Sequence, residues 1–207
     1  KMCGNGIRCF AKFIYDHKLS DKHVLEIETK AGLRIVELLF DGDKCIGAKV
    51  DMGKPILTCS DIPCNYNQET MIDQTIVIDD YKYNLTSISM GNPHTVTFVD
   101  DLETLDLKKI GPKFEFHEMF PEGVNTEFVE VINDHYIKMR VWERGSGETM
   151  ACGTGACAAM YASYLNNYTK NKVTVELLGG CLEIEYINDT IMMSGPAVNV
   201  FEGTIEV

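Results

Sequence analysis

A Cys-Gly-x-Gly unit that occurs twice constrains the fold of this chain more than any other feature. One copy is CGNG at residues 3–6 and the other, 149 positions later, is CGTG at residues 152–155. Helix-favouring residues follow each copy, so we expect one helix to begin at Cys3 and another at Cys152. A repeat of such long period predicts a duplicated domain, because solenoid repeats are far shorter.

The likeness between the two copies continues downstream of the cysteines. Residues 24–28 correspond to 173–177, residues 31–35 to 179–183, and residues 52–55 to 194–196. Alternating apolar residues and Gly turns predict that each copy runs helix, strand, Gly turn, strand and third strand. In the first copy we expect a helix at 3–17 and strands at 23–29, 33–39 and 46–51.

The stretch between the copies has its own pattern. Residues 56–73 contain Pro63 and mixed polarity, and we expect them to cross between two domains. Alternation then predicts strands at 75–79, 84–90, 95–99, 126–132 and 136–141, with a helix at 102–116 that is interrupted near Gly111 and Pro112. A glycine-broken loop at 142–149 leads to Cys152. This long stretch precedes only the second cysteine, so we expect a further segment of about half a domain upstream of Cys3.

Composition excludes several classes of protein. The 207 residues are 45% hydrophobic, enough for a substantial core, and the net charge of −12 argues against a nucleic-acid partner. No apolar run is long enough to span a bilayer, so we expect no membrane partner. The eight cysteines are expected to be reduced thiols in a cytoplasm, since a chain of this length needs no disulfide scaffold.

A cysteine at a helix N-terminus has two interpretations. Unpaired N–H groups of the first turn can stabilise a thiolate and hold a carboxylate. Alternatively, Cys152 is a small buried hydrophobe and the glycines mark a turn. The duplication favours the first interpretation, because two such thiols could face each other across a domain cleft. One thiolate would remove a proton from a carbon and the opposite thiol would return one, inverting a stereocentre without a cofactor.

Two other stretches are candidates for substrate contacts. Glu143 and Arg144 form either a surface ion pair or a carboxylate and a guanidinium fork that suit the two ends of an amino acid. Residues 91–94 (GNPH) form either a tight turn or a ligand-binding loop between strands.

Four separated motifs resemble those of the diaminopimelate epimerases. They are MCGNGIRC at 2–9, GNPH at 91–94, GVNTEF at 123–128 and WERGSGETMACGTGA at 142–156. Proline racemases share the Cys-Gly-x-Gly pairs but lack GNGxRC together with WERGSGET. The resemblance implies a cofactor-independent isomerase that interconverts LL- and meso-diaminopimelate for lysine and peptidoglycan synthesis. It also implies an α/β fold of two similar domains, each with its sheet wrapped around a central helix.

The resemblance also implies a role for each matching residue. Cys3 and Cys152 would be the acid–base pair, and the first-turn N–H groups of the two helices would hold the reacting carboxylate. Glu143 would bind the reacting ammonium, and His94 would lie close by. Backbone N–H groups of Gly4, Asn5, Gly153 and Thr154 would hold the reacting carboxylate. Asn92, Asn125 and Arg144 would hold the distal, non-reacting L-centre. The family has further substrate contacts upstream of its first cysteine, so we expect activity to depend on them.

We expect two domains. The first comprises residues 1–55 together with a strand at 198–207 that crosses back to it, and the second comprises residues 56–197. No cofactor and no metal are expected, the partner is a small molecule, and a homodimer is left open. Two alternatives remain: a racemase of another amino acid such as proline or hydroxyproline, and a non-enzymatic thiol redox or metal-binding protein. The spacing of Cys59 and Cys64 does not fit the commoner zinc sites.

Overall fold

The computed structural model describes residues 3–30 and 32–205. Residues 2, 31, 206 and 207, which belong to predicted motifs or strands, lie outside the described residues. The helices are α1 (Gly4–Asp16), the short 3₁₀ turn η1 (Cys59–Asp61), α2 (Leu107–Glu115) and α3 (Gly153–Leu165). The strands are β1 (Val24–Thr29), β2 (Gly32–Asp41), β3 (Lys44–Asp51), β4 (Gln74–Ile78), β5 (Tyr81–Ser89), β6 (Pro93–Phe98), β7 (Asn125–Asn133), β8 (Tyr136–Glu143), β9 (Gly147–Thr149), β10 (Lys172–Leu177), β11 (Gly180–Ile187) and β12 (Thr190–Pro196).

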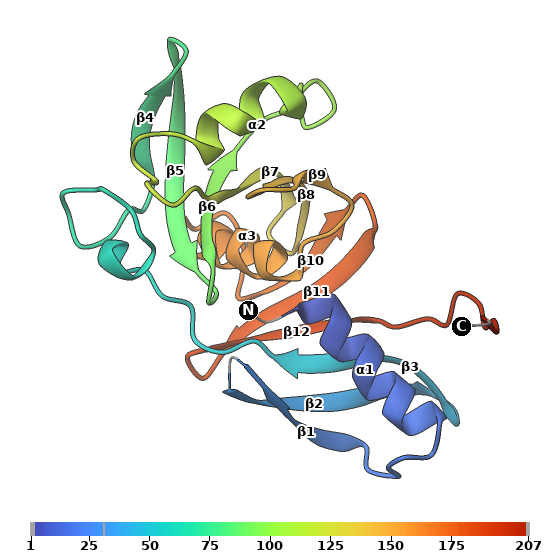
Figure 1. Cartoon of the computed structure of the whole chain (residues 1–207). Helices are drawn as coiled ribbons and strands as arrows, with labels where there is room; N and C mark the ends of the chain where they lie inside the picture. Colours follow the sequence, from blue (N-terminus) through green and yellow to red (C-terminus); the bar gives the residue numbers. More distant parts are fainter. Residues whose placement is uncertain (1–2, 31, 206–207) are drawn as a thin grey trace.

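The described strands form a continuous, strongly curved sheet (Figure 1) in the order β1-β2-β3-β12-β11-β10-β8-β7-β6-β5-β4, with β9 paired to β8. The two sequence copies are joined where their last strands pair, with Val50 opposite Met193. A β-carbon on Gly47 would stand 2.3 Å from the Gly195 carbonyl oxygen, so glycine is required for this close approach. The sheet therefore holds both copies in one fixed relation.

The predicted order of elements is confirmed in both copies. Each has a helix and then three antiparallel strands: α1, β1, β2 and β3 in the first, and α3, β10, β11 and β12 in the second. Both helices begin directly after their cysteine, which serves as an N-cap residue with extended backbone. An N-cap residue has this non-helical conformation while its carbonyl accepts the first helical hydrogen bond, so each thiol is fixed at a helix end.

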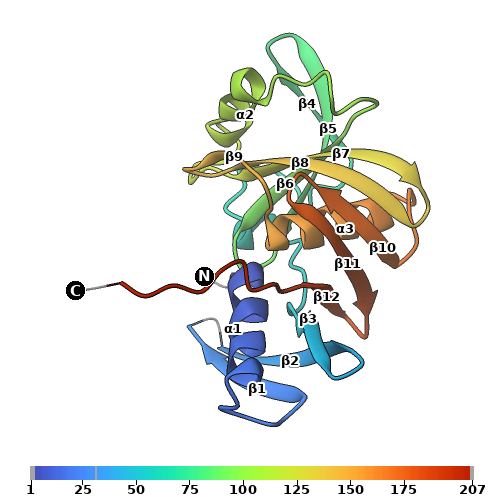
Figure 2. The same ribbon diagram turned by 90° about the vertical axis from the view of Figure 1, so that its right-hand side faces the viewer.

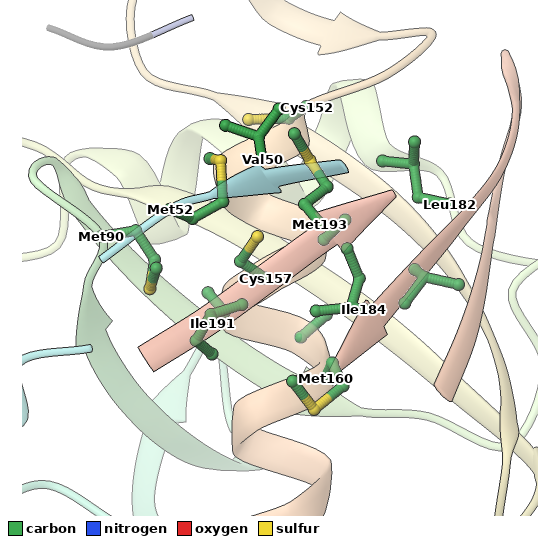
Figure 3. Close-up of a cluster of buried hydrophobic side chains, with 14 of the residues drawn as sticks. Val50, Met52, Met90, Cys152, Cys157, Met160, Leu182, Ile184, Ile191 and Met193 are labelled. Atoms are coloured by element: carbon green, nitrogen blue, oxygen red, sulfur yellow. The ribbon is translucent and has the colours of Figure 1, made fainter. Parts of the chain in front are cut away.

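The two helices differ in burial because they differ in side-chain size. Eleven of the 13 residues of α3 are buried, and nearly all of these are small, so strands can approach the helix from every side. Its Cys152, Cys157 and Met160 pack with Met193 of β12 in the main core (Figure 3). In contrast, α1 is amphipathic and lies on β2 and β3 with its Phe10 side half exposed.

A second core lies between α2, the strands β4, β5 and β7, and the segment 56–73. This segment was expected to be a crossing between domains, and that expectation is incomplete. Ile62 and Met71 are fully buried in the second core, and Ile56 pairs with Ser89 through two backbone hydrogen bonds. Buried apolar side chains therefore make residues 56–73 an integral part of the second copy.

Two further expectations were wrong. The helix expected at 102–116 starts only at Leu107, where Asp106 caps it by accepting from the Lys109 N–H at 3.3 Å, and Pro112 lies inside it without breaking it. The strand expected at 198–207 is absent from residues 198–205, which leave the body as an extended, exposed segment (Figure 2). β3 cannot pair with this segment, because β2 and β12 occupy its two edges, and the outer edge of β1 is left unpaired among the described strands.

Candidate active site

A cavity of about 290 Å³ lies where the N-termini of α1 and α3 meet. It brings together ten of the eleven residues that the sequence predicted, together with Ser146 and Ala151, which were missed. The lining residues are Cys3, Gly4, Asn5, Asn92, Asn125, Glu143, Arg144, Ser146, Ala151, Cys152, Gly153 and Thr154. His94 is the predicted residue that does not line the cavity.

The two helix ends approach closely because glycines follow both cysteines. A β-carbon on Gly153 would lie 3.6 Å from the Gly4 α-carbon. The first N–H groups of an α-helix have no intrahelical acceptor and form the positive end of its dipole. Two such ends at one cavity are suited to holding an anionic group such as a carboxylate.

The two thiols have different surroundings. Cys3 is exposed, and its Sγ accepts a hydrogen bond from the Gly6 N–H at 3.4 Å. Cys152 is buried, with its Sγ 3.5 Å from the Thr154 hydroxyl. Burial, and then the charge of Glu127, raise the pKa of Cys152 to about 12. Burial at this helix end therefore favours the thiol form of Cys152 over the thiolate.

The far side of the cavity is built by the loop that leads into β7 and the loop that follows β8. Asn125 donates to the Pro93 carbonyl at 2.6 Å and accepts from the Arg144 N–H at 3.0 Å. Arg144 Nη1 donates to the Glu122 carbonyl at 2.9 Å, which positions the guanidinium over the loop. The Glu143 carboxylate accepts from the Thr149 hydroxyl at 2.5 Å. These contacts leave further donors on Arg144 and further acceptor capacity on Glu143 for a ligand.

Two charged residues behind the cavity were missed in the sequence. Arg8 is buried and donates to the Gly4 carbonyl at 3.3 Å and to the Asn5 side-chain oxygen at 3.0 Å, so it braces the first turn of α1. Burial lowers its pKa. Glu127 is fully buried and contacts His94 Nδ1 at 2.7 Å. A basic residue on the apolar face of α1, and an acidic one among buried positions of β7, were the signals that could have found them.

Other features of the described part bear on the alternatives. All eight cysteines are free thiols. Among residues 3–30 and 32–205, no three His, Cys, Asp or Glu side chains are grouped to hold a metal ion. No helix in the same ranges is both long and apolar enough to cross a membrane.

The fold is shared with solved structures of distant sequence, among them one named as a probable proline racemase. A probable proline racemase from Agrobacterium radiobacter superposes with a TM-score of 0.68 at 13% identity, covering 94% of this chain and 65% of the racemase chain. The sequence specifies the family. The profile described as Diaminopimelate epimerase matches residues 1–58 and 86–200. Curated diaminopimelate epimerases from Methanococcus maripaludis and Agathobacter rectalis are 52% and 50% identical over all of this chain and 76% of their own length. The chain belongs to the diaminopimelate epimerase family.

Proposed function

We propose that this protein interconverts LL- and meso-diaminopimelate without a cofactor, with Cys3 and Cys152 as the two acid–base groups. The observation that carries the proposal is that both thiols and both helix N-termini line one cavity. Family membership supports the choice of substrate, since the relatives named above are diaminopimelate epimerases.

The proposed reaction needs one thiolate and one thiol. Burial raises the pKa of Cys152, so we assign Cys152 as the proton donor and Cys3 as the base for one direction of the reaction. The Cys3 thiolate removes the α-proton, the carbon–hydrogen electron pair remains on the substrate, and Cys152 delivers its proton to the opposite face. The carbon is inverted, Cys152 becomes the thiolate and Cys3 the thiol. That state is suited to the reverse direction, or returns to the first by proton exchange with water.

The carbanion is the difficult intermediate, and the helix ends address it. Negative charge moves from the α-carbon onto the substrate carboxylate as the proton leaves. N–H groups of Gly4 and Asn5 on one side, and of Gly153 and Thr154 on the other, would then donate to that carboxylate more strongly than before. Preorganised donors of this kind stabilise the transition state more than the bound substrate.

The other end of the substrate would bind on the far side of the cavity. Arg144 offers a planar fork for the distal carboxylate, and Asn92 and Asn125 offer amide groups for the distal ammonium and carboxylate. Glu143 would receive the ammonium at the reacting centre. A proline racemase would need no distal pocket, so this set of residues favours a substrate with two amino-acid centres.

The test is a substrate panel with the protein expressed from its complete gene. LL-diaminopimelate, meso-diaminopimelate, L-proline and trans-4-hydroxy-L-proline are incubated separately, and the stereoisomers are resolved by chiral chromatography. We expect both diaminopimelate isomers to reach the same mixture and the proline compounds to remain unchanged. Turnover of proline with no turnover of diaminopimelate would contradict the proposal.

A further inference from the structure

A buried acid–base pair lies behind the cavity, outside the residues assigned above. His94 and Glu127 stand on the parallel strands β6 and β7, and both side chains are fully buried. His94 Nδ1 and Glu127 Oε1 are 2.7 Å apart, so they share a hydrogen bond. Burying two ionisable groups is costly even when they are paired, so packing alone does not explain their presence here.

The number of protons on the His94–Glu127 pair determines its net charge. Neither His94 Nε2 nor Glu127 Oε2 has a hydrogen-bond partner within the described residues. With two protons, one shared and one on Nε2, the pair has no net charge. With one proton it is an anion. A net charge on a fully buried pair is strongly disfavoured, so burial favours the two-proton state.

The pair lies directly against Cys152. A β-carbon on Gly155 would stand 2.6 Å from Glu127 Oε1 and 3.3 Å from Cys152 Sγ. Those two atoms are therefore within about 6 Å of each other, a separation at which like charges in a buried site oppose each other strongly. Glu143 on β8 also acts on both Glu127 and Cys152, and it can supply no positive charge. The cationic Arg8 on α1 acts on Cys157 of α3.

We propose that Glu127 is a positioning residue for Cys152. By sharing a proton with His94 Nδ1, it keeps the pair free of net charge beneath Cys152 Sγ and holds the imidazole with its proton on Nε2. The inference rests on the proposed function, because it assigns Cys152 a proton that must leave and return. If Glu127 were an anion, each departure of that proton would place a second negative charge in the same buried site.

The electrostatics agree with this geometry. Burial is the largest effect on Glu127 and raises its pKa, although His94 acts in the opposite direction. The charge that Glu127 would carry is in turn the second largest cause that raises the pKa of Cys152. The two groups therefore compete for one negative charge, and the proton on the pair allows Cys152 to be the one that ionises.

The first test reads the protons directly. In protein labelled with ¹⁵N-histidine, proton–nitrogen correlation spectra report which imidazole nitrogen carries hydrogen, and comparison with His94→Gln assigns the signal. We expect His94 Nε2 to be protonated at pH 7.5. An unprotonated Nε2 would contradict the proton assigned to that nitrogen and would overturn the proposal.

The second test separates charge from shape. Glu127→Gln keeps the size of the side chain and can donate to Nδ1, so iodoacetamide should alkylate Cys152 at pH 7.5 within about twofold of the wild-type rate, measured on the Cys152 peptide by mass spectrometry. A rate at least about 10-fold higher would show that Glu127 normally repels the thiolate and is charged, which overturns the proposal. Neither readout requires turnover, so failure here is distinguishable from failure of the proposed function.

The third test addresses positioning. Glu127→Ala should lower kcat at least about 10-fold with KM within threefold, and Glu127→Gln should restore kcat to within threefold of wild type. Glu130→Ala is the matched control: it lies on the same strand, and its carboxylate accepts from the Leu102 N–H at 3.2 Å. An unchanged kcat in Glu127→Ala, or a Gln variant as poor as the Ala variant, would refute the role. If Glu127→Ala does not fold, the first two tests still decide.

Discussion

Gly155 and Gly6 occupy equivalent positions in the two copies, and the account predicts that alanine has opposite effects at them. At Gly6 an added β-carbon would meet only Cys3, with Sγ at 3.4 Å. This is ordinary contact, and alanine is the better helix former, so Gly6→Ala should stabilise the protein by about 0.5–1 kcal/mol. At Gly155 the same carbon would stand 2.6 Å from Glu127 Oε1, which cannot retreat because His94 holds it.

Overpacking of this kind costs about 1–3 kcal/mol, against the same gain in helix propensity. Gly155→Ala should therefore be less stable than Gly6→Ala by about 1–3 kcal/mol in urea unfolding, and should melt several degrees lower. Because Cys152 Sγ is 3.3 Å from the added carbon, the thiol should also shift, and a misplacement approaching 1 Å lowers turnover by roughly 100-fold.

Two results would contradict this packing of Glu127 against α3. If Gly155→Ala were as stable and as active as Gly6→Ala, the packing of Glu127 against the first turn of α3 would be wrong. If the destabilisation arose elsewhere, it would persist in a Glu127→Ala background. We expect it to disappear there, since the double mutant removes the atoms in collision, and a double-mutant cycle measures this coupling.

Three further predictions follow from the site and its surroundings. Cys3→Ala and Cys152→Ala should each abolish epimerisation, whereas Cys9→Ala, at an exposed position, should keep activity. Cys157→Ala should keep turnover but lower the free energy of unfolding by on the order of 1 kcal/mol, because the Cys157 side chain is fully buried. Chiral chromatography measures the activities and urea unfolding measures the stability. Burial raises the pKa of Glu127 above its ordinary 4.5, so its contribution to stability is complete below that pH and is lost as pH rises through the folded-state value. The unfolding free energy of Glu127→Gln relative to wild type should therefore increase between pH 5 and pH 9, and a constant difference would contradict the shift. Arg144→Lys should raise KM for diaminopimelate at least about 10-fold. The planar guanidinium can donate to the loop carbonyls and to a distal carboxylate at the same time, and the single ammonium of lysine cannot. An unchanged KM would argue against a contact with the distal carboxylate.

The part of the fold that could be predicted is encoded locally. The cysteines and glycines at 3–6 and 152–155 determine where two helices begin, and the duplication indicates that the strands after them are equivalent. Since both helix ends carry the same motif, their meeting at one cavity could be anticipated, and ten predicted residues line it.

The remainder depends on contacts between distant parts of the chain. The expected strand is absent from residues 198–205, which extend away from the sheet as an exposed segment, and only the pairing of β3 with β12 shows that β3 offers them no edge. Glu127 could not be identified as buried behind Cys152 without knowing that β7 packs against α3. His94 was expected at the substrate, but the same packing places it behind the cavity.

Epimerisation in D₂O shows directly whether two thiols serve opposite faces of one carbon. Thiol protons exchange with solvent, so the account predicts that the product epimer formed from LL-diaminopimelate carries deuterium at its inverted α-carbon from the first turnovers, while the remaining substrate keeps its hydrogen. Proton NMR and mass spectrometry of the separated isomers measure both. Early product that retains the substrate's hydrogen, or inversion that continues in Cys152→Ala, would contradict the two-base account.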